Sequence, residues 1–210
     1  MEFHFEESLK KTYRIETPER IATPRLVLFQ AELECNITKI RRSLKEIAPD
    51  YGLHALWPHV KTHKSHWVVE KLLRVGIGGF KATPNEVEML VKAGAKSIFV
   101  AYPLLPPDVE KLGRLITENR EIRFYVQISQ HDHVEHLLAA AHGVNIKWSY
   151  LLDLDVGMHR TGMAPENALA FYNSLPLTPQ LQFAGLHAYD GHNHSQELEK
   201  RRIESLCTLN

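Results

Sequence analysis

The chain has 210 residues, 25 basic and 25 acidic side chains and therefore no formal net charge, and 44% of its residues are hydrophobic. This length and composition are typical of a globular protein with one substantial core. The balanced charge argues against nucleic-acid binding, and no apolar run reaches the roughly 18 residues that span a membrane. Two cysteines, Cys35 and Cys207, are too few for a disulfide framework or a zinc site, so we expect a cytoplasmic protein.

Before residue 53 the sequence predicts two segments. Residues 1–22 are polar and are expected to form an N-terminal extension. Residues 23–52 are expected to hold an opening strand at 26–29, followed by an amphipathic helix at 32–47 with apolar residues three and four positions apart.

From residue 53 to residue 210 the sequence predicts a single domain built from six units, each a strand followed by a helix. Apolar runs predict the strands, which cover residues 53–61, 79–83, 97–101, 123–128, 150–156 and 183–189. Helical periodicity and capping residues predict the helices, which cover residues 65–75, 84–93, 107–118, 131–141, 165–173 and the segment from 195 onward.

Alternating strands and helices of this kind predict an α/β fold with a parallel sheet covered by helices. No Gly-x-Gly-x-x-Gly motif follows an early strand, which favours a (β/α)8 TIM-type barrel over a dinucleotide-binding fold. A complete barrel has eight units in about 250 residues. The six units therefore predict an incomplete barrel that stops before strands seven and eight, and we expect such a chain to fold poorly by itself.

Three of the predicted strands end in unusually polar stretches. These stretches are residues 58–64, Pro-His-Val-Lys-Thr-His-Lys, residues 153–163, which hold two aspartates and Arg160, and residues 185–194, which hold three histidines and Tyr189. The carboxyl ends of barrel strands share one rim, and active sites form there. Helices begin soon after each stretch, so their N-termini favour anions at the same rim.

Lys61 is the candidate nucleophile of the first stretch. A lysine acts as a nucleophile when its neutral form is reachable near neutral pH, and burial and neighbouring cations both favour that form. We expect Lys61 at the end of a buried strand, close to His63 and Lys64, which suits imine formation with an aldehyde cofactor. The structural alternative is a strand-end lysine that extends to solvent.

Together the three stretches resemble those of the fold-type III pyridoxal phosphate enzymes, whose barrel is the alanine racemase N-terminal kind. The branch they resemble most is D-threonine aldolase and eukaryotic-type D-serine dehydratase. Residues 58–64 look like the cofactor-lysine motif of that branch, and residues 155–162, Asp-Val-Gly-Met-His-Arg-Thr-Gly, match its Asp-x-Gly-Met-x-Arg-x-Gly segment. Residues 185–192 look like the strand whose aromatic group contacts the pyridine ring.

The resemblance implies roles for individual residues. Lys61 carries the Schiff base with pyridoxal 5'-phosphate, whereas Lys64 is a neighbouring cation. Arg160 approaches the phenolic oxygen of the cofactor or the substrate carboxylate, and Tyr189 contacts the ring. With His63, these residues form the expected cofactor-binding set. Candidates for proton transfer at the rim are His59, His63, His187 and His192.

The implied activity is that of a pyridoxal phosphate-dependent lyase that cleaves or dehydrates D-3-hydroxy amino acids. The alternatives are an amino-acid racemase of the same fold, a non-catalytic barrel that binds pyridoxal phosphate, and an inactive fragment. In this family a C-terminal β domain follows the barrel, so we expect a divalent metal, Zn²⁺ or Mn²⁺, to bind only there. The full-length protein is expected to be a homodimer.

Overall fold

The computed structural model describes residues 13–207 of the chain, which divides into two compact units, Met1–Gly52 and Leu53–Asn210. The described part of the first unit contains the 3₁₀ helix η1, Pro18–Arg20, and the helix α2, Gln30–Ile47. The helix predicted at 32–47 is confirmed. The prediction of a strand at 26–29 is wrong. These residues are irregular, and the described part of this unit contains no strand with which their backbone groups could pair.

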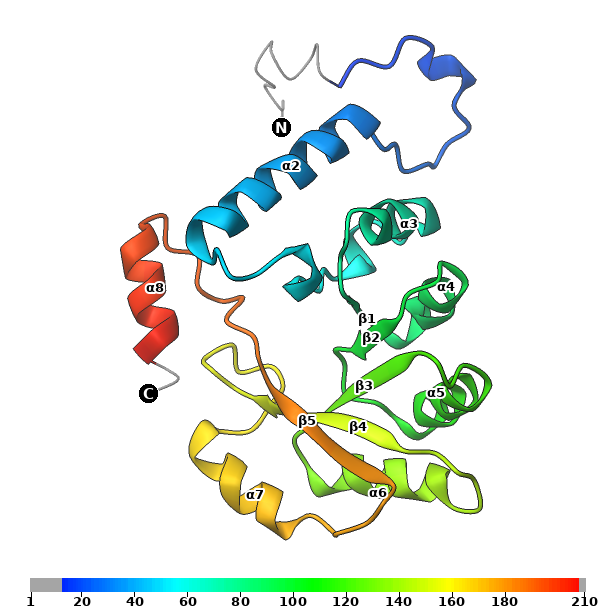
Figure 1. The fold of residues 1–210 in the computed structure, drawn as a ribbon, viewed down its shortest axis with the longest axis vertical. Coiled ribbons are helices and arrows are strands. Elements are labelled where there is room, and N and C mark those ends of the chain that lie inside the picture. Colours follow the sequence, from blue (N-terminus) through cyan, green and yellow to red (C-terminus); the bar gives the residue numbers. More distant parts are fainter. Residues whose placement is uncertain (1–12, 208–210) are drawn as a thin grey trace. The chain divides into compact units, whose positions relative to one another are not determined.

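The second unit alternates strands with helices along the whole of its described length (Figure 1). Its strands are β1 Phe80–Ala82, β2 Ser97–Val100, β3 Arg123–Ile128, β4 Trp148–Leu154 and β5 Leu181–Ala188. Its α-helices are α3 His66–Arg74, α4 Val87–Lys92, α5 Pro106–Glu118, α6 His131–Ala141, α7 Ala168–Ser174 and α8 Leu198–Cys207. Its 3₁₀ helices are η2 Leu53–Ala55, η3 Val60–Thr62, η4 Pro84–Glu86 and η5 Pro165–Asn167.

The five strands form one open sheet in the order β1-β2-β3-β4-β5, and every neighbouring pair is parallel. Helices connect the successive strands, and Figure 1 shows α3, α4 and α5 stacked one after another along one side of them. The arrangement is that of an incomplete TIM-type barrel, as the sequence predicted. Because all strands run in the same direction, their carboxyl ends lie at one edge of the sheet.

The first strand of the predicted barrel, residues 53–61, does not form. The helices η2 and η3 occupy most of this segment, and its pairing with β1 is reduced to one bridge between His59 and Lys81. The Lys81 N–H donates to the Pro58 carbonyl at 3.0 Å, whereas Pro58 has no N–H with which to extend a ladder. The segment still lies beside β1, in the place of a first barrel strand.

The core lies between the sheet and its helices. Trp148, Phe80 and Ile98 on the strands and Val109 on α5 are at most 1% exposed. Burial of each such side chain stabilises the fold by roughly 1.5–3 kcal/mol. The apolar strand runs and helix faces read from the sequence therefore pack against one another as expected for a parallel sheet.

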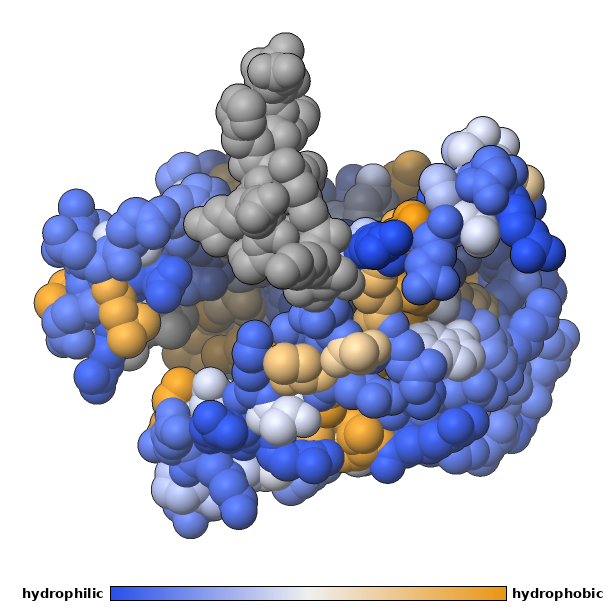
Figure 2. Space-filling view, turned by 90° about the horizontal axis from the view of Figure 1, so that it is seen from above, coloured by the Kyte–Doolittle hydropathy of each residue, from blue (hydrophilic) through white to orange (hydrophobic). Residues whose placement is uncertain are grey.

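The strand β5 has large apolar side chains that the described segments cover only in part, with Phe183 packed against the rings of Tyr150 and Tyr172. Phe183 is 43% exposed and Leu186 is 59% exposed, because β5 pairs with β4 on one side only. On the face of the molecule in Figure 2, by contrast, hydrophilic residues dominate and hydrophobic residues appear in scattered groups. Within residues 13–207, the helices are all too short or too polar to cross a membrane.

A buried carboxylate, Glu86, fixes the turn between β1 and α4. It accepts hydrogen bonds from the backbone N–H of Thr83 at 2.8 Å and from the Thr83 hydroxyl at 2.5 Å, and Lys64 Nζ lies 3.2 Å from its other oxygen. Burial alone would raise the pKa of Glu86, but the Thr83 hydrogen bonds and the Lys64 charge outweigh it and hold the pKa below the ordinary value.

Replacing Glu86 should therefore destabilise the protein in a pH-dependent way. Glu86→Gln should lower the free energy of unfolding by about 2 kcal/mol at neutral pH, as expected for lost hydrogen bonds to a buried charge. Because the folded pKa is depressed, the difference from wild type should persist above the ordinary carboxyl pKa and disappear as the pH falls through the folded pKa. Urea unfolding at pH 7 and pH 3 measures it. The exposed Glu110 on α5 provides the control, since Glu110→Gln should change stability little at either pH.

Candidate active site

A cavity of about 510 Å³ opens at the carboxyl ends of the strands. Apart from the η3 segment, its walls come from the strands β1, β3 and β5 and from the segments that follow β1, β2, β4 and β5, which is where parallel barrels place their chemistry. Its polar and aromatic lining comprises His59, Lys61, Lys81, Thr83, Tyr102, Gln127, Arg160, Thr161, His187 and Tyr189. Three of the four residues predicted to bind a cofactor thus line one cavity, namely Lys61, Arg160 and Tyr189.

Lys61 lies in the 3₁₀ helix η3 and its side chain is exposed, so the prediction that it ends a buried strand is wrong. Its backbone N–H donates to Nδ1 of His59 at 3.2 Å. Burial, and then the charge of Lys61, lower the pKa of His59, which keeps the His59 ring an acceptor. The turn of η3 thus directs Lys61 toward the cavity, and its covalent role remains a prediction.

The other histidine and the other lysine of residues 58–64, His63 and Lys64, contribute to local structure. His63 Nδ1 accepts a hydrogen bond from the Ser65 N–H at 3.1 Å, and Ser65 in turn caps α3. Burial lowers the pKa of His63. Lys64 has a positive φ of 44° and pairs with Glu86. Neither His63 nor Lys64 lines the cavity, and the cofactor-binding role of His63 stays a prediction.

Asp155 organises the loop that presents Arg160. Its Oδ1 accepts the N–H groups of Gly157 at 3.0 Å and His159 at 2.9 Å, and its Oδ2 lies 2.9 Å from the His159 ring. Hydrogen bonds from His159 and Gly157 hold the pKa of Asp155 below its ordinary value despite its partial burial. The loop closes through hydrogen bonds of Met163 with the backbone of residues 153 and 155 at 2.9 and 2.8 Å.

The loop brings Arg160 against the aromatic residue that follows β5. The Arg160 guanidinium carbon lies 5.1 Å from the centre of the Tyr189 ring, a cation–π distance. The two residues come from the second and third polar stretches of the sequence, which we expected to share one rim. A cation and an aromatic ring therefore meet in the cavity that Lys61 and Lys81 also line.

A second lysine, Lys81 of β1, belongs to a hydrogen-bonded chain across the sheet. Its Nζ lies 2.9 Å from His187 Nε2, and His187 Nδ1 lies 2.6 Å from Asp153 Oδ1. Gln127 Nε2 donates to the other oxygen of Asp153 at 3.1 Å. The sequence reasoning missed Lys81 and Gln127 as site residues. The available signal was a charged residue inside a run predicted to be a buried strand.

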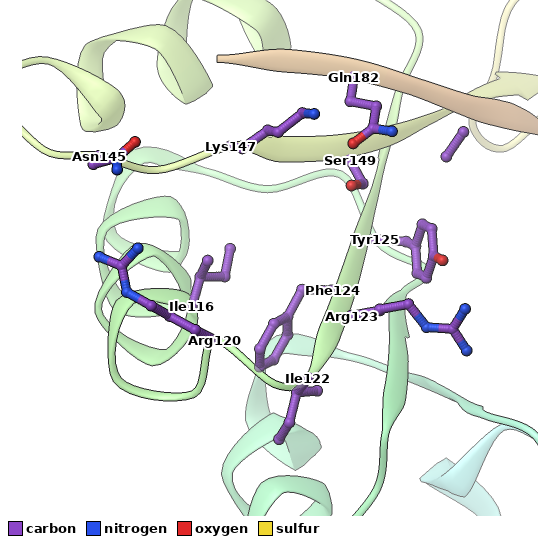
Figure 3. A pocket seen from close by; sticks show the side chains of 11 residues that line it. Ile116, Arg120, Ile122, Arg123, Phe124, Tyr125, Asn145, Lys147, Ser149 and Gln182 are labelled. Carbon is purple, nitrogen blue, oxygen red and sulfur yellow. The ribbon is translucent and has the colours of Figure 1, made fainter. Parts of the chain in front are cut away.

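A second cavity, of about 560 Å³, lies at the opposite edge of the sheet, by the amino ends of β3, β4 and β5 (Figure 3). Arg120, Arg123 and Lys147 line it together with Ser149 and Gln182. It lacks a histidine, and the amino-terminal face of a parallel barrel serves stability rather than catalysis. The cavity with the two lysines and two histidines is therefore the candidate active site.

Among the residues that the structure describes, the candidate site has no arrangement of ligands for a metal ion. Within the described part of the chain, no group of three or more His, Cys, Asp and Glu side chains is placed to hold a metal. Asp153 is hydrogen-bonded to His187, and Asp155 is hydrogen-bonded to His159. The cavity lining offers a ligand two amines, a guanidinium and aromatic rings, from Lys61, Lys81, Arg160, Tyr102 and Tyr189.

The parallel sheet with an amine-lined cavity at its carboxyl edge defines a β/α-barrel binding domain. The chain belongs to the alanine racemase N-terminal domain family, whose sequence model matches residues 31–208. Members of this family bind pyridoxal phosphate. A search of curated proteins finds no match to the sequence.

Solved structures share the fold at low sequence identity. D-threonine aldolase from Filomicrobium marinum is 22% identical with a TM-score of 0.76, and the match covers 90% of this chain and 50% of that one. D-threo-3-hydroxyaspartate dehydratase from Delftia sp. HT23 is 19% identical with a TM-score of 0.66, over 90% and 52% of the two chains. Alanine racemase from Bacillus anthracis is 20% identical with a TM-score of 0.67, over 84% and 45%. The chain thus spans about half the length of these proteins.

Proposed function

We propose that this chain is the cofactor-binding part of a pyridoxal phosphate-dependent lyase that acts on D-3-hydroxy amino acids. The observation that carries the proposal is the cavity at the carboxyl edge, where Lys61, Arg160 and Tyr189 come together. The likeness to D-threonine aldolase and to D-threo-3-hydroxyaspartate dehydratase supports the substrate class. The polar motifs at 58–64 and 155–162 support the same branch.

The chemistry of the lining residues fits pyridoxal phosphate. The cofactor has an aldehyde, a phenolic oxygen, an aromatic ring and a phosphate, and when bound it stabilises negative charge at the α-carbon of an amino acid. Lys61 supplies an exposed primary amine for the aldehyde, and Tyr189 supplies a ring surface. Arg160 supplies a fixed positive charge with several N–H donors for the phenolic oxygen or a carboxylate.

The residues of this chain would perform three tasks in the reaction. Lys61 would hold the cofactor and release it to the amino group of the substrate. The loop fixed by Asp155 would keep Arg160 in place, so that its charge need not be reorganised during the reaction. The buried side chains of Asp153 and His187 would maintain the polar wall behind the reacting groups.

Adding pyridoxal 5'-phosphate to the purified chain tests the binding step. We expect a visible absorbance band from the amine-bound cofactor, saturating at one equivalent per chain. Arg160→Met should weaken this binding about tenfold or more, since a charge-assisted hydrogen bond contributes roughly 1.5–3 kcal/mol. An exposed arginine on α5, Arg114, gives the matched control, and Arg114→Met should bind like wild type. No band at any concentration would contradict the proposal.

Product analysis with the cofactor-loaded, full-length protein tests the reaction class. With D-threonine, carbon–carbon cleavage gives glycine and an aldehyde, whereas dehydration gives a 2-oxo acid and ammonia. Racemisation gives only a change of configuration at the α-carbon. The lyase proposal expects one of the first two product pairs, and a change of configuration alone would replace it with the racemase alternative.

A further inference from the structure

We propose that Lys81 is the acid–base residue of this cavity, with His187 and Asp153 as the residues that position it. The inference rests on the proposed function for the identity of the ligand, a D-amino acid bound next to Lys61. It adds a role for a second lysine, separate from the lysine that would hold the cofactor.

The contacts among Gln127, Asp153, His187 and Lys81 indicate which atoms donate and which accept. Asp153 accepts from Gln127 through one oxygen and contacts His187 Nδ1 through the other, so His187 Nδ1 carries a hydrogen and donates. The 2.9 Å contact between His187 Nε2 and Lys81 Nζ is then a hydrogen bond when the imidazole offers its lone pair and the amine donates. Both –NH₃⁺ and –NH₂ can donate, so Lys81 can gain or lose a proton without breaking the chain.

The supporting residues are held rigidly. The Asp153 and His187 side chains are 3% and 13% exposed, and Gln127 is 4% exposed. The Phe99 ring packs edge-on against His187 at 4.9 Å, and Lys81 Nζ lies 5.4 Å from the centre of the same ring. A salt bridge alone would explain a lysine beside an aspartate, but here the His187 ring lies between the two and the amine lines the cavity.

The surroundings of Lys81 favour exchange of its proton. Burial lowers its pKa, the charge of Asp153 on β4 raises it, and the charges of Lys61 on η3 and Arg160 on the β4–η5 loop lower it further. The net pKa lies below the ordinary 10.5. The other titratable groups near it are His187 on β5, which is within hydrogen-bond distance, and His59, Tyr102 and Tyr189, which line the same cavity. An amine of this kind is suited to general acid–base catalysis.

The position of Lys81 also places it beside the ligand. It pairs in register with His59, two residues before Lys61, and both lysines line the same cavity. Gln127, another lining residue, has a buried Oε1 without a hydrogen-bond partner in the described part of the chain. That oxygen is an acceptor for a donor group of a ligand or a water molecule. In the proposed step Lys81, as the neutral amine, would take the proton from Cα of the ligand, so that the Cα–H bond would break and an N–H bond would form on Lys81, while the bound cofactor would supply an electron-accepting ring.

Trace acetylation with acetic anhydride tests the amine without any cofactor. The folded chain is acetylated across a range of pH and then digested. Mass spectrometry of the peptides measures the labelling of Lys81 and of the exposed Lys96. We expect half-maximal labelling of Lys81 at a pH below 10.5. The pH of half-maximal labelling should fall further in Asp153→Asn, which removes the charge that raises the pKa of Lys81. It should rise in Lys61→Gln, which removes a cation that lowers this pKa. A Lys81 profile that follows Lys96 in all three proteins would overturn the proposal.

Exchange of the α-hydrogen of D-serine in D₂O, followed by NMR with the cofactor-loaded full-length protein, tests the step itself. Lys81→Gln should keep the absorbance band of the bound cofactor and slow the exchange by about 100-fold or more. Lys96→Gln is the matched control and should exchange like wild type. Wild-type exchange in Lys81→Gln would refute the role. Failure of wild type to bind the cofactor would count against the proposed function alone, since the acetylation profile still decides the state of Lys81.

Discussion

Lys61→Ala should abolish covalent binding of pyridoxal 5'-phosphate. The aldehyde forms an imine with a primary amine, and Lys61 is the exposed amine of η3 at the cavity. The visible band of the bound cofactor should disappear. Because Lys61 is exposed, the free energy of unfolding should change by less than about 0.5 kcal/mol.

Lys64→Ala is the matched control, because Lys64 lies three positions after Lys61 in the stretch of residues 58–64. Lys64 pairs with Glu86 and does not line the cavity, so its loss should leave the band in place. Lys81→Ala separates the two cavity lysines and should also retain the band. An unchanged band in Lys61→Ala, or its loss only in Lys81→Ala, would show that the wrong amine has been assigned.

Gly162→Ala should have a large effect on both stability and cofactor binding. Gly162 has a φ of +99°, and a Cβ there would lie 2.6 Å from the backbone nitrogen of Asp155 and 2.7 Å from the carbonyl carbon of Leu154. The conformational cost and the clash should together lower the free energy of unfolding by on the order of 3 kcal/mol. Because the loop presents Arg160, affinity for pyridoxal 5'-phosphate should fall as well.

The structure offers a control for the conformational part of this effect. Gly143 has a φ of +74°, and a Cβ there would have no atom within 4 Å. Gly143→Ala should therefore cost only about 1–2 kcal/mol and leave cofactor binding unchanged. Urea unfolding and cofactor titration of the two variants measure the difference. Equal losses in both would mean that the loop of residues 155–163 tolerates a side chain at its close contact.

The strands and helices with strong local patterns were predictable from the sequence. The strand Arg123–Ile128 and the helix His131–Ala141 form with the predicted bounds, because apolar spacing determines which face each element buries. The segment 53–61 misled the prediction because its apolar residues are those of a strand, whereas Pro58 cannot donate to a ladder. For the same reason the burial of Lys61 was overestimated.

The candidate site was predictable only in part. The polar stretches at the carboxyl ends of strands indicated Lys61, Arg160 and Tyr189, because a parallel sheet brings such ends together. The contact between Lys81 and His187 joins residues 106 positions apart and depends on the curvature of the sheet and on rotamers. No local pattern encodes such a contact, so the one local signal for Lys81 was that it is a charged residue inside a predicted buried strand.

The most direct test of the central claim is to map the lysine that binds the cofactor. The protein is incubated with pyridoxal 5'-phosphate, reduced with borohydride and digested, and the modified peptide is identified by mass spectrometry. We predict one phosphopyridoxyl group per chain, on Lys61. Modification of Lys64 or Lys81 in place of Lys61, or labelling scattered over surface lysines, would contradict this assignment of the site.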